Sequence, residues 1–291
     1  MSSFESIVID SSFGGKIKSL KEVMDTTPPP VIWHTRTIID ELLGGGLSKK
    51  SLVALVGGTG DGKSLLLAHL ASRFSEDKKV LYLSFENTSE NDCDRFRQCA
   101  KIYYQFNAEN IGYLNIFESE IESISKWKTE YIERIVFKGA WDVVCIDAWQ
   151  NSFDTVNQEE ISKVGNELMT YLRNLMYKAD TPIFFTWQST KSANGKALKD
   201  ITSEDLSGSA GVGRYATDVF FVKREKDEGE KTKISHRKIK LLKTRGSKNA
   251  RWDNPIADLE LAGYFTVCIN PINNKIWLWK KKWTLKIIGI N

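Results

Sequence analysis

A glycine-rich segment that ends in a lysine and a serine is the part of this chain whose residue types and spacing point most directly to chemistry. Its residues fit the spacing G-x-x-x-x-G-K-[ST], in which backbone N–H groups surround a phosphate. We expect Lys63 to reach the β- and γ-phosphates of a nucleotide and Ser64 to coordinate Mg²⁺. The alternative, a glycine-rich turn without a ligand, is disfavoured by the strand pattern before it and the helix pattern after it. The residues predicted to bind nucleotide here are Gly57, Gly58, Thr59, Gly60, Asp61, Gly62, Lys63, Ser64 and Leu65.

Two carboxylates stand directly after apolar runs of the kind that form buried strands. Asp147 follows residues 143–146, and Glu86 follows residues 80–85. In an open sheet of parallel strands, ligands bind beyond the carboxyl ends of the strands, so both side chains are expected near the phosphates. We predict that Asp147 orients the Mg²⁺ ion and that Glu86 is the base that polarises the attacking water. A helix cap at Asp147 and a surface carboxylate at Glu86 are the structural alternatives.

A glutamine and a lysine-bearing segment follow a third apolar run, residues 183–187. The neutral amide of Gln188 can hydrogen-bond the γ-phosphate and respond to its loss, or it is simply a polar loop residue. The segment after it carries Lys191, Lys196 and Lys199 around a glycine. Lysines on such a segment suit contact with nucleic-acid phosphates regardless of base sequence. A solvated loop is the alternative.

An α/β fold has to position these residues. Short apolar runs alternate with longer segments of helical periodicity, which is the pattern of a mainly parallel sheet with helices on both faces. After residue 222, strand-like runs follow one another with short breaks, so we expect C-terminal antiparallel strands along one edge. The predicted strands are 52–56, 80–85, 143–146, 183–186 and 219–222, then 234–242, 264–269 and 276–279, and the predicted helices include 63–74 and 160–177.

Residues 1–30 are predicted to form an N-terminal arm, and residues 31–291 a single nucleotide-hydrolysing domain. The arm is rich in Ser, Gly and Lys, and it ends in three consecutive prolines, which cannot continue a helix. A short amphipathic helix in the arm would need a covering surface, either its own domain or a neighbouring subunit. The apolar residues at helical spacing are Ile17, Leu20, Val23 and Met24.

The bulk composition is that of an ordinary globular protein, with 41% hydrophobic and 27% charged residues among 291. The net charge of +4 is too small by itself to indicate a nucleic-acid partner. The four cysteines include no Cys-x-x-Cys pair, so no zinc site is expected and the thiols are predicted to be reduced. No apolar stretch is long enough for a signal peptide or a membrane span, so we predict a cytoplasmic protein without a membrane partner.

Four segments carry recognisable motifs: residues 38–47, which lead into the phosphate loop, residues 83–86 with Arg95 downstream, residues 203–219, and the Lys-Thr-Arg-Gly of residues 243–246. Together they resemble the RecA/DnaB superfamily, and most closely the motor domain of the hexameric replicative DNA helicases of bacteria and bacteriophages. The resemblance extends from about residue 35 to residue 263. The Asp-Leu-Ser-Gly-Ser and Ala-Thr-Asp strings within 203–219 are the most specific to helicases, because the other segments are shared with RadA-type recombinases and KaiC-type ATPases.

The resemblance implies a RecA-like fold, ATP (or another NTP) with Mg²⁺, and a homo-hexameric ring that translocates on single-stranded DNA and unwinds forked duplex. It implies that Lys243 and Arg245 act in trans on the next subunit, where a guanidinium neutralises charge on the γ-phosphoryl group. An exposed basic hairpin is the alternative for these two residues. Arg224 matches a position that contacts the base or ribose, and the lysine-bearing segment matches the loop that lines the DNA channel.

Two other functions remain open. A RadA-like recombinase or mediator would form filaments on DNA, whereas a KaiC-like regulatory ATPase would act on protein partners. The chain also departs from the helicases, because the thirty residues before its core leave no room for their collar domain or primase. A minimal motor that works with a separate primase or helicase loader, in the host cytoplasm if phage-encoded, and an excised motor domain are both compatible with this.

Overall fold

The computed structural model of this chain describes residues 20–26, 32–116, 131–152, 158–224, 237–245, 250, 255–259, 268–269, 276–279 and 285–288. The chain divides into two compact units, Met1–Val31 and Ile32–Asn291. In the first unit the described part is helix α1, Leu20–Thr26. Its apolar residues Leu20 and Met24 are 74% and 70% exposed, and Ile17 lies outside the described residues. The surface that covers this face therefore stays a prediction.

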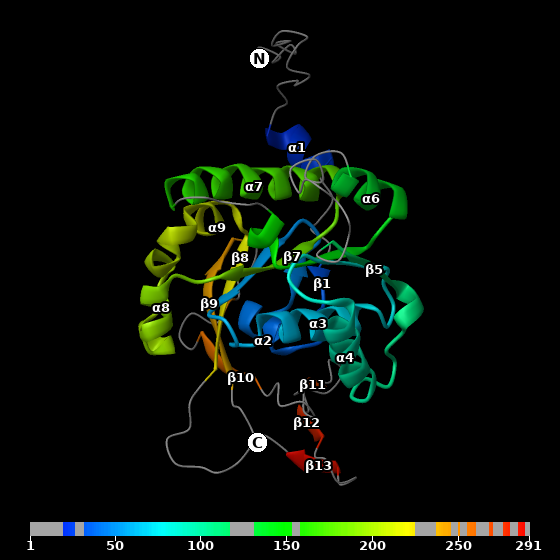
Figure 1. Cartoon of the computed structure of the whole chain (residues 1–291). Coiled ribbons are helices and arrows are strands. Elements are labelled where there is room, and N and C mark those ends of the chain that lie inside the picture. The colour runs from blue at the N-terminus through cyan, green and yellow to red at the C-terminus, as the bar shows by residue number, and fades with distance from the viewer. Residues whose placement is uncertain are drawn as a thin grey trace. The chain divides into compact units, whose positions relative to one another are not determined.

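The second unit is built on an eight-stranded sheet in the order β10-β9-β8-β3-β7-β6-β4-β5 (Figure 1). The strands from β8 to β5 run parallel, as the sequence predicted. Strand β3 is buried along its whole length, and its sequence is nearly all apolar because both of its faces are covered. The parallel strands are β3 (Leu52–Gly57), β4 (Val80–Ser84), β5 (Ile111–Asn115), β6 (Val143–Asp147), β7 (Ile183–Gln188) and β8 (Asp218–Arg224).

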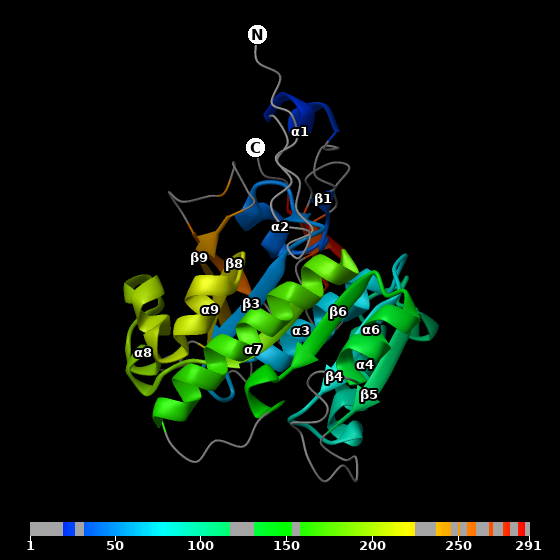
Figure 2. The same ribbon diagram turned by 90° about the horizontal axis from the view of Figure 1, so that it is seen from above.

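Helices cover both faces of this sheet, as Figures 1 and 2 show. Val53 and Leu55 of β3 belong to the core beneath one set of helices, and Ala54 and Val56 belong to the core beneath the other. The alternation arises because successive side chains of a strand point to opposite faces. None of the described helices is long and apolar enough to cross a lipid bilayer. The first face carries α2 (Ile38–Leu43), α3 (Lys63–Phe74) and α4 (Ser89–Ala100), and the second carries α6 (Ile132–Gly139), α7 (Gln158–Ala179) and α9 (Ala210–Tyr215).

The antiparallel strands differ in part from the prediction. Strand β9 (Arg237–Thr244) pairs with β8, and β10 (Ile256–Leu259) pairs with β9, so an antiparallel extension does lie along one edge. The runs predicted at residues 264–269 and 276–279 instead contribute to a separate three-stranded sheet. An alternating pattern indicates which side of a strand is buried but not which strand it pairs with, so the partner was wrong. The separate sheet comprises β11 (Cys268–Ile269), β12 (Ile276–Trp279) and β13 (Leu285–Ile288).

Helix α4 and strand β5 were not predicted. Thr88 caps α4 by accepting a hydrogen bond from the backbone N–H of Asn91. Most of α4 is exposed or half-buried and β5 lies at the sheet edge, so neither segment has the strong apolar pattern that marks a buried element. The remaining elements are β1 (Ile32–Trp33) paired with β2 (Leu47–Ser48), α8 (Lys191–Gly195), and 3-10 turns at Ala108–Asn110, Trp149–Ser152, Leu198–Asp200 and Ser203–Ser209.

Candidate active site

The predicted phosphate loop connects the carboxyl end of β3 to the first residue of α3. Gly62, which precedes the helix, has φ +97°, a conformation that side chains other than hydrogen strain. A Cβ on Gly57 would lie 2.4 Å from the carbonyl oxygen of Val222 on β8, so the backbone there approaches its neighbour too closely for a side chain. Asp61 Oδ2 accepts a 2.7 Å hydrogen bond from Gly58 N, which closes the loop on itself.

Lys63 is buried beside this loop, and its Nζ donates to the carbonyl oxygen of Gly58 at 2.8 Å. Burial lowers the pKa of Lys63, while the negative charges of Glu86, Asp147 and Asp61 act in the opposite direction. Carboxylates from three parts of the chain thus surround one ammonium group. The lysine and the two carboxylates predicted from the sequence therefore belong to one electrostatic site.

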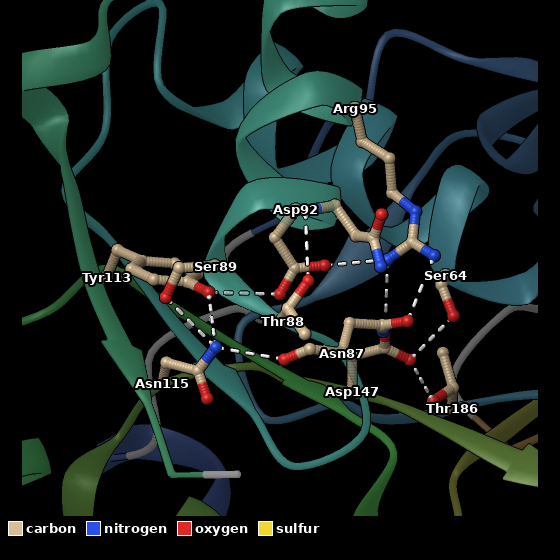
Figure 3. Close-up of polar contacts among 11 residues, drawn as sticks. Ser64, Asn87, Thr88, Ser89, Asp92, Arg95, Tyr113, Asn115, Asp147 and Thr186 are labelled. Carbon is tan, nitrogen blue, oxygen red and sulfur yellow. Dashed lines mark hydrogen bonds and ion pairs between the residues drawn. The ribbon is translucent and has the colours of Figure 1, made fainter. Parts of the chain in front are cut away.

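Asp147, at the carboxyl end of β6, is fully buried and lies at the centre of a hydrogen-bond network (Figure 3). Its Oδ1 accepts from Ser64 Oγ at 3.0 Å and from Thr186 Oγ1 at 2.6 Å. Its Oδ2 accepts from Asn87 Nδ2 at 3.0 Å, and Arg95 Nη1 lies 3.8 Å away. Burial raises the pKa of Asp147, whereas the two hydroxyl donors and the Arg95 charge lower it.

The donor set of this site suits Mg²⁺. A hydroxyl oxygen on Ser64 and a carboxylate oxygen on Asp147 lie 3.0 Å apart, next to the phosphate loop. Mg²⁺ prefers oxygen ligands and is usually held by one or two carboxylates together with nucleotide phosphates. In the described part of the chain, no three His, Cys, Asp or Glu side chains form a metal site of their own. A bound nucleotide would therefore have to supply part of the coordination shell.

Glu86 follows β4, and the structure corrects one part of its predicted placement. The strand next to β3 on this side is β7, and β6 also lies between β3 and β4, so Glu86 is not on the strand adjacent to the phosphate-loop strand. Its side chain is exposed, yet its charge acts on both Lys63 and Asp147. The carboxylate therefore stands at the open side of the site, where water has access.

Gln188 is the last residue of β7 and pairs in register with Gly57. Its Nε2 donates to Thr59 Oγ1 of the phosphate loop at 2.9 Å. Gln150, in the 3-10 turn after β6, donates from its Nε2 to Gln188 Oε1 at 3.2 Å, and its own Oε1 accepts from Gln188 N. Gln188 thus connects the phosphate loop to the turn that follows Asp147.

Arg224 ends β8, and its backbone N–H donates to Asp61 Oδ1 at 3.0 Å. Its partner in register on β9 is Arg237, which sequence reasoning missed. Arg237 Nε donates to the carbonyl oxygen of Asp61 at 3.1 Å and lies over Gly62. Burial lowers the pKa of Arg237, and the Arg224 charge lowers it further. The hairpin pairing of β8 and β9, rather than any motif, brings this second guanidinium to the loop.

Lys243 and Arg245 lie at the other end of the sheet. Lys243 pairs with Val219 near the start of β8, and its Nζ donates to the carbonyl oxygens of Gly213 and Ala216 at 2.6 and 2.7 Å. Arg245 Nη2 donates to the carbonyl oxygen of Arg214 at 2.6 Å. Burial, followed by the nearby Arg245 charge, lowers the pKa of Lys243 to about 8. Neither side chain lies at its own chain's phosphate loop, so their action in trans stays a prediction.

The lysine-bearing segment after Gln188 touches the phosphate loop. A Cβ on Gly58 would lie 3.0 Å from Asn194 Oδ1. Lys196 forms an ion pair with Asp205, so its charge is partly neutralised within the chain. Lys199 is exposed, and Lys191 begins α8 with a side chain outside the described residues.

Three polar residues around Asp147 were missed by sequence reasoning, namely Thr186, Asn87 and Asp92. Thr186 lies two residues before Gln188 on β7, so strand alternation places it on the same face, and this signal was available in the sequence. Asn87 directly follows Glu86, but nothing local indicates that its side chain turns back to β6. Asp92 lies on the unpredicted helix α4 and was hidden with it.

Comparisons with known proteins place the chain in a family. Residues 36–257 match the family described as "ATPase: KaiC". The chain is 28% identical over 163 residues to a "DNA repair protein RadA" of Treponema pallidum (strain Nichols) and 34% identical over 92 residues to one of Aquifex aeolicus (strain VF5). These alignments cover 53% and 30% of this chain. They span only 31% and 20% of the length of those relatives.

Two solved structures share the fold. The ATPase domain of a helicase matches with a TM-score of 0.61 and 15% identity, over 83% of this chain and 91% of that one. A KaiC-like protein from Pyrococcus horikoshii OT3 matches with a TM-score of 0.56 and 17% identity, over 87% of this chain and 100% of that one. The predicted RecA-like α/β fold is thereby confirmed, while the closer likeness to replicative helicases stays a prediction. Because the matched residues 36–257 make up most of the chain and include the whole predicted ATP site, this protein belongs to the KaiC family of RecA-like P-loop ATPases.

Proposed function

We propose that this ATPase is a ring-forming motor that translocates on single-stranded DNA and unwinds duplex DNA. In this proposal Lys63 and Ser64 bind the phosphates and Mg²⁺ of ATP, and Asp147 orients the ion. Bound Mg²⁺ would supply positive charge to the β- and γ-phosphate oxygens. Glu86 accepts a proton from the attacking water, and its exposed position on the open side of the site supports that role.

The observation that carries this proposal is the contact between the lysine-bearing segment and the phosphate loop. Asn194 lies against Gly58, and Ser189 N donates to the carbonyl oxygen of Gly57 at 3.0 Å. Ser189 also donates from its Oγ to Asn194 Oδ1. A segment fixed to the loop at two points would shift when the γ-phosphate leaves, because loop contacts with that phosphate are lost. Lys191 and Lys199 on this segment are the groups proposed to follow the DNA backbone.

A second connection supports the same coupling. Gln188 bonds to Thr59 of the phosphate loop and to Gln150, which precedes residues 151–158. Those residues are the second candidate for the channel lining, and residues 153–157 lie outside the described part of the chain. One side chain in contact with the γ-phosphate region thus lies at the start of both candidate DNA-contacting segments. Loss of the phosphate would reach both through Gln188.

Two alternatives each have an observation in their favour. The family match to the KaiC ATPases supports a regulatory ATPase that acts on protein partners and is indifferent to DNA. The two RadA relatives are DNA repair proteins by name, which supports a filament-forming recombinase or mediator. All three proposals use the same ATP site, so they differ in what the energy of hydrolysis drives.

Steady-state ATP hydrolysis with and without single-stranded DNA, at low salt and at a concentration that permits assembly, is the experiment that tests the proposal. The motor proposal expects strong stimulation by DNA, and it expects Gln188→Ala to keep ATP binding but lose most of that stimulation. Hydrolysis that is indifferent to DNA would contradict it and favour the regulatory ATPase. If DNA stimulates hydrolysis, unwinding of a forked duplex and closed rings in electron micrographs support the motor, whereas filaments without unwinding support the recombinase.

A further inference from the structure

The residue after the proposed base is bonded on three sides. The side-chain amide of Asn87 donates from Nδ2 to Asp147 Oδ2 at 3.0 Å and accepts at Oδ1 from Arg95 Nη2 at 3.1 Å. Its backbone carbonyl accepts from Asn115 Nδ2 at 2.9 Å. Figure 3 shows the amide of Asn87 between Asp147 and Arg95. The amide orientation is fixed chemically, because the reverse one would place an NH₂ group against a guanidinium.

Glu86 is therefore bracketed by two bonds to one residue. On its amino side, Phe85 N donates to the carbonyl oxygen of Asp147 at 2.5 Å. On its carboxyl side, Asn87 bonds to the carboxylate of the same Asp147. The backbone that carries the proposed base is thus tied directly to the residue proposed to orient Mg²⁺. Such ties fix the direction in which the Glu86 side chain leaves the backbone.

The partners of Asn87 are themselves held by elements packed around it. Arg95 Nη1 donates to Asp92 Oδ1 at 2.6 Å, and Asp92 is fully buried. Asp92 Oδ2 in turn accepts from Tyr113 of β5 at 3.1 Å. Asn115, two residues further along β5, also donates to Ser89 Oγ and to the Tyr113 hydroxyl, each at 3.1 Å. Helix α4 and strand β5 thus present a rigid frame to Asn87.

We propose that Asn87, held by Arg95 and Asn115, is a positioning residue that sets the geometry of Glu86 relative to Asp147. This inference rests on the proposed role of Glu86 as the base for ATP hydrolysis. Removal of the Asn87 amide frees one side of the Glu86 backbone and leaves the nucleotide-binding groups of α3 in place. The consequence is a slower chemical step with unchanged nucleotide binding. Partners outside the ligand shell of a metal site commonly affect activity about 10- to 100-fold.

The test compares kcat, KM and the affinity for a non-hydrolysable ATP analogue in four variants. Asn87→Ala is expected to lower kcat about 10- to 100-fold with unchanged affinity for the analogue. Asn115→Ala is expected to cause a smaller loss of kcat. The double variant should be no slower than Asn87→Ala alone, because both residues act through one anchor. Asn91→Ala, which removes an exposed asparagine on α4, is the matched control and should behave as the wild type.

Each failure has its own signature. Wild-type kcat in Asn87→Ala overturns the positioning role, and so does a parallel loss of kcat, analogue affinity and melting temperature, which would mean a purely structural role. Losses that add fully in the double variant overturn the shared anchor. Glu86→Gln separates the two levels of the proposal, because normal turnover in that variant removes Glu86 as the base. Loss of turnover in Glu86→Gln with normal turnover in Asn87→Ala removes only the positioning proposal.

Discussion

At the scale of single residues, the chemistry of this protein depends on how a few charged groups are kept in place away from water. Asp147 accepts hydrogen bonds from side chains on α3, on β7 and on the segment after β4. Burying a carboxylate is costly unless its oxygens are satisfied, and these donors together with the nearby Arg95 charge offset that cost. Lys63 is held in the same way by one carbonyl oxygen and by surrounding negative charge. The site is thus arranged before nucleotide arrives.

Lys63→Ala is the sharpest change at this scale. The variant is expected to lose ATP turnover by at least about 100-fold, because the ammonium stabilises charge that develops on the γ-phosphoryl group. Phosphate release assays would measure this. Lys79→Ala, which removes an exposed lysine from the same half of the chain, should leave turnover unchanged. Normal turnover in Lys63→Ala would mean that the glycine-rich segment is only a structural turn.

At the scale of elements, α3 does more than present the phosphate loop. His69 on this helix is buried against Tyr103, with Nδ1 2.8 Å from the tyrosine hydroxyl oxygen. The two rings meet edge to face with centroids 5.6 Å apart, and the Arg73 guanidinium lies 5.0 Å from the Tyr103 ring centre. This contact fastens α3 to the segment that follows α4. Burial lowers the pKa of His69 from 6.5 to about 4.

The buried histidine predicts how stability depends on pH. Because the unfolded chain binds a proton at His69 below pH 6.5 and the folded chain does so only near pH 4, acidification across this window favours unfolding. A pKa lowered this far corresponds to about 3 kcal/mol of stability lost by the lower end of the window. Urea unfolding from neutral pH down to about pH 4 should therefore show a steeper loss for the wild type than for His69→Gln. The exposed His34→Gln is the control, and an equal slope in wild type and His69→Gln would contradict the prediction.

At the scale of the whole molecule, the two basic residues at the end of β9 lie far from the ATP site that they are proposed to complete. Lys243 and Arg245 lie level with the start of β3, whereas the phosphate loop follows its end. Groups at the opposite end of a sheet from a site of this kind can serve such a site only across a subunit boundary. Hydrolysis would then depend on assembly, which is the behaviour expected of a ring or a filament.

Mixing of inactive variants tests this arrangement. Arg245→Ala should bind ATP normally and turn it over roughly 10³-fold more slowly, as expected when an arginine finger is removed. Glu86→Ala should be inactive for a different reason. In mixtures where subunits exchange, some sites combine an intact Glu86 with an intact Arg245 from the neighbour, so partial activity should return. Mixtures as inactive as their components would weaken the trans assignment, whereas loss of ATP binding in Arg245→Ala alone would indicate a structural role.

Residue spacing and periodicity were enough to predict the phosphate loop, the carboxylates after two buried strands, the glutamine after a third, and the parallel sheet between two layers of helices. These features are local, because spacing along the chain specifies a loop that wraps phosphate and periodicity specifies which faces are buried. The folded chain was needed to learn that β7 and β6 separate β4 from β3, and that Asn87 and Thr186 converge on Asp147. Those contacts join residues 39 and 60 positions apart. Strand order and the direction of single side chains arise from packing across such distances, and no local pattern encodes them.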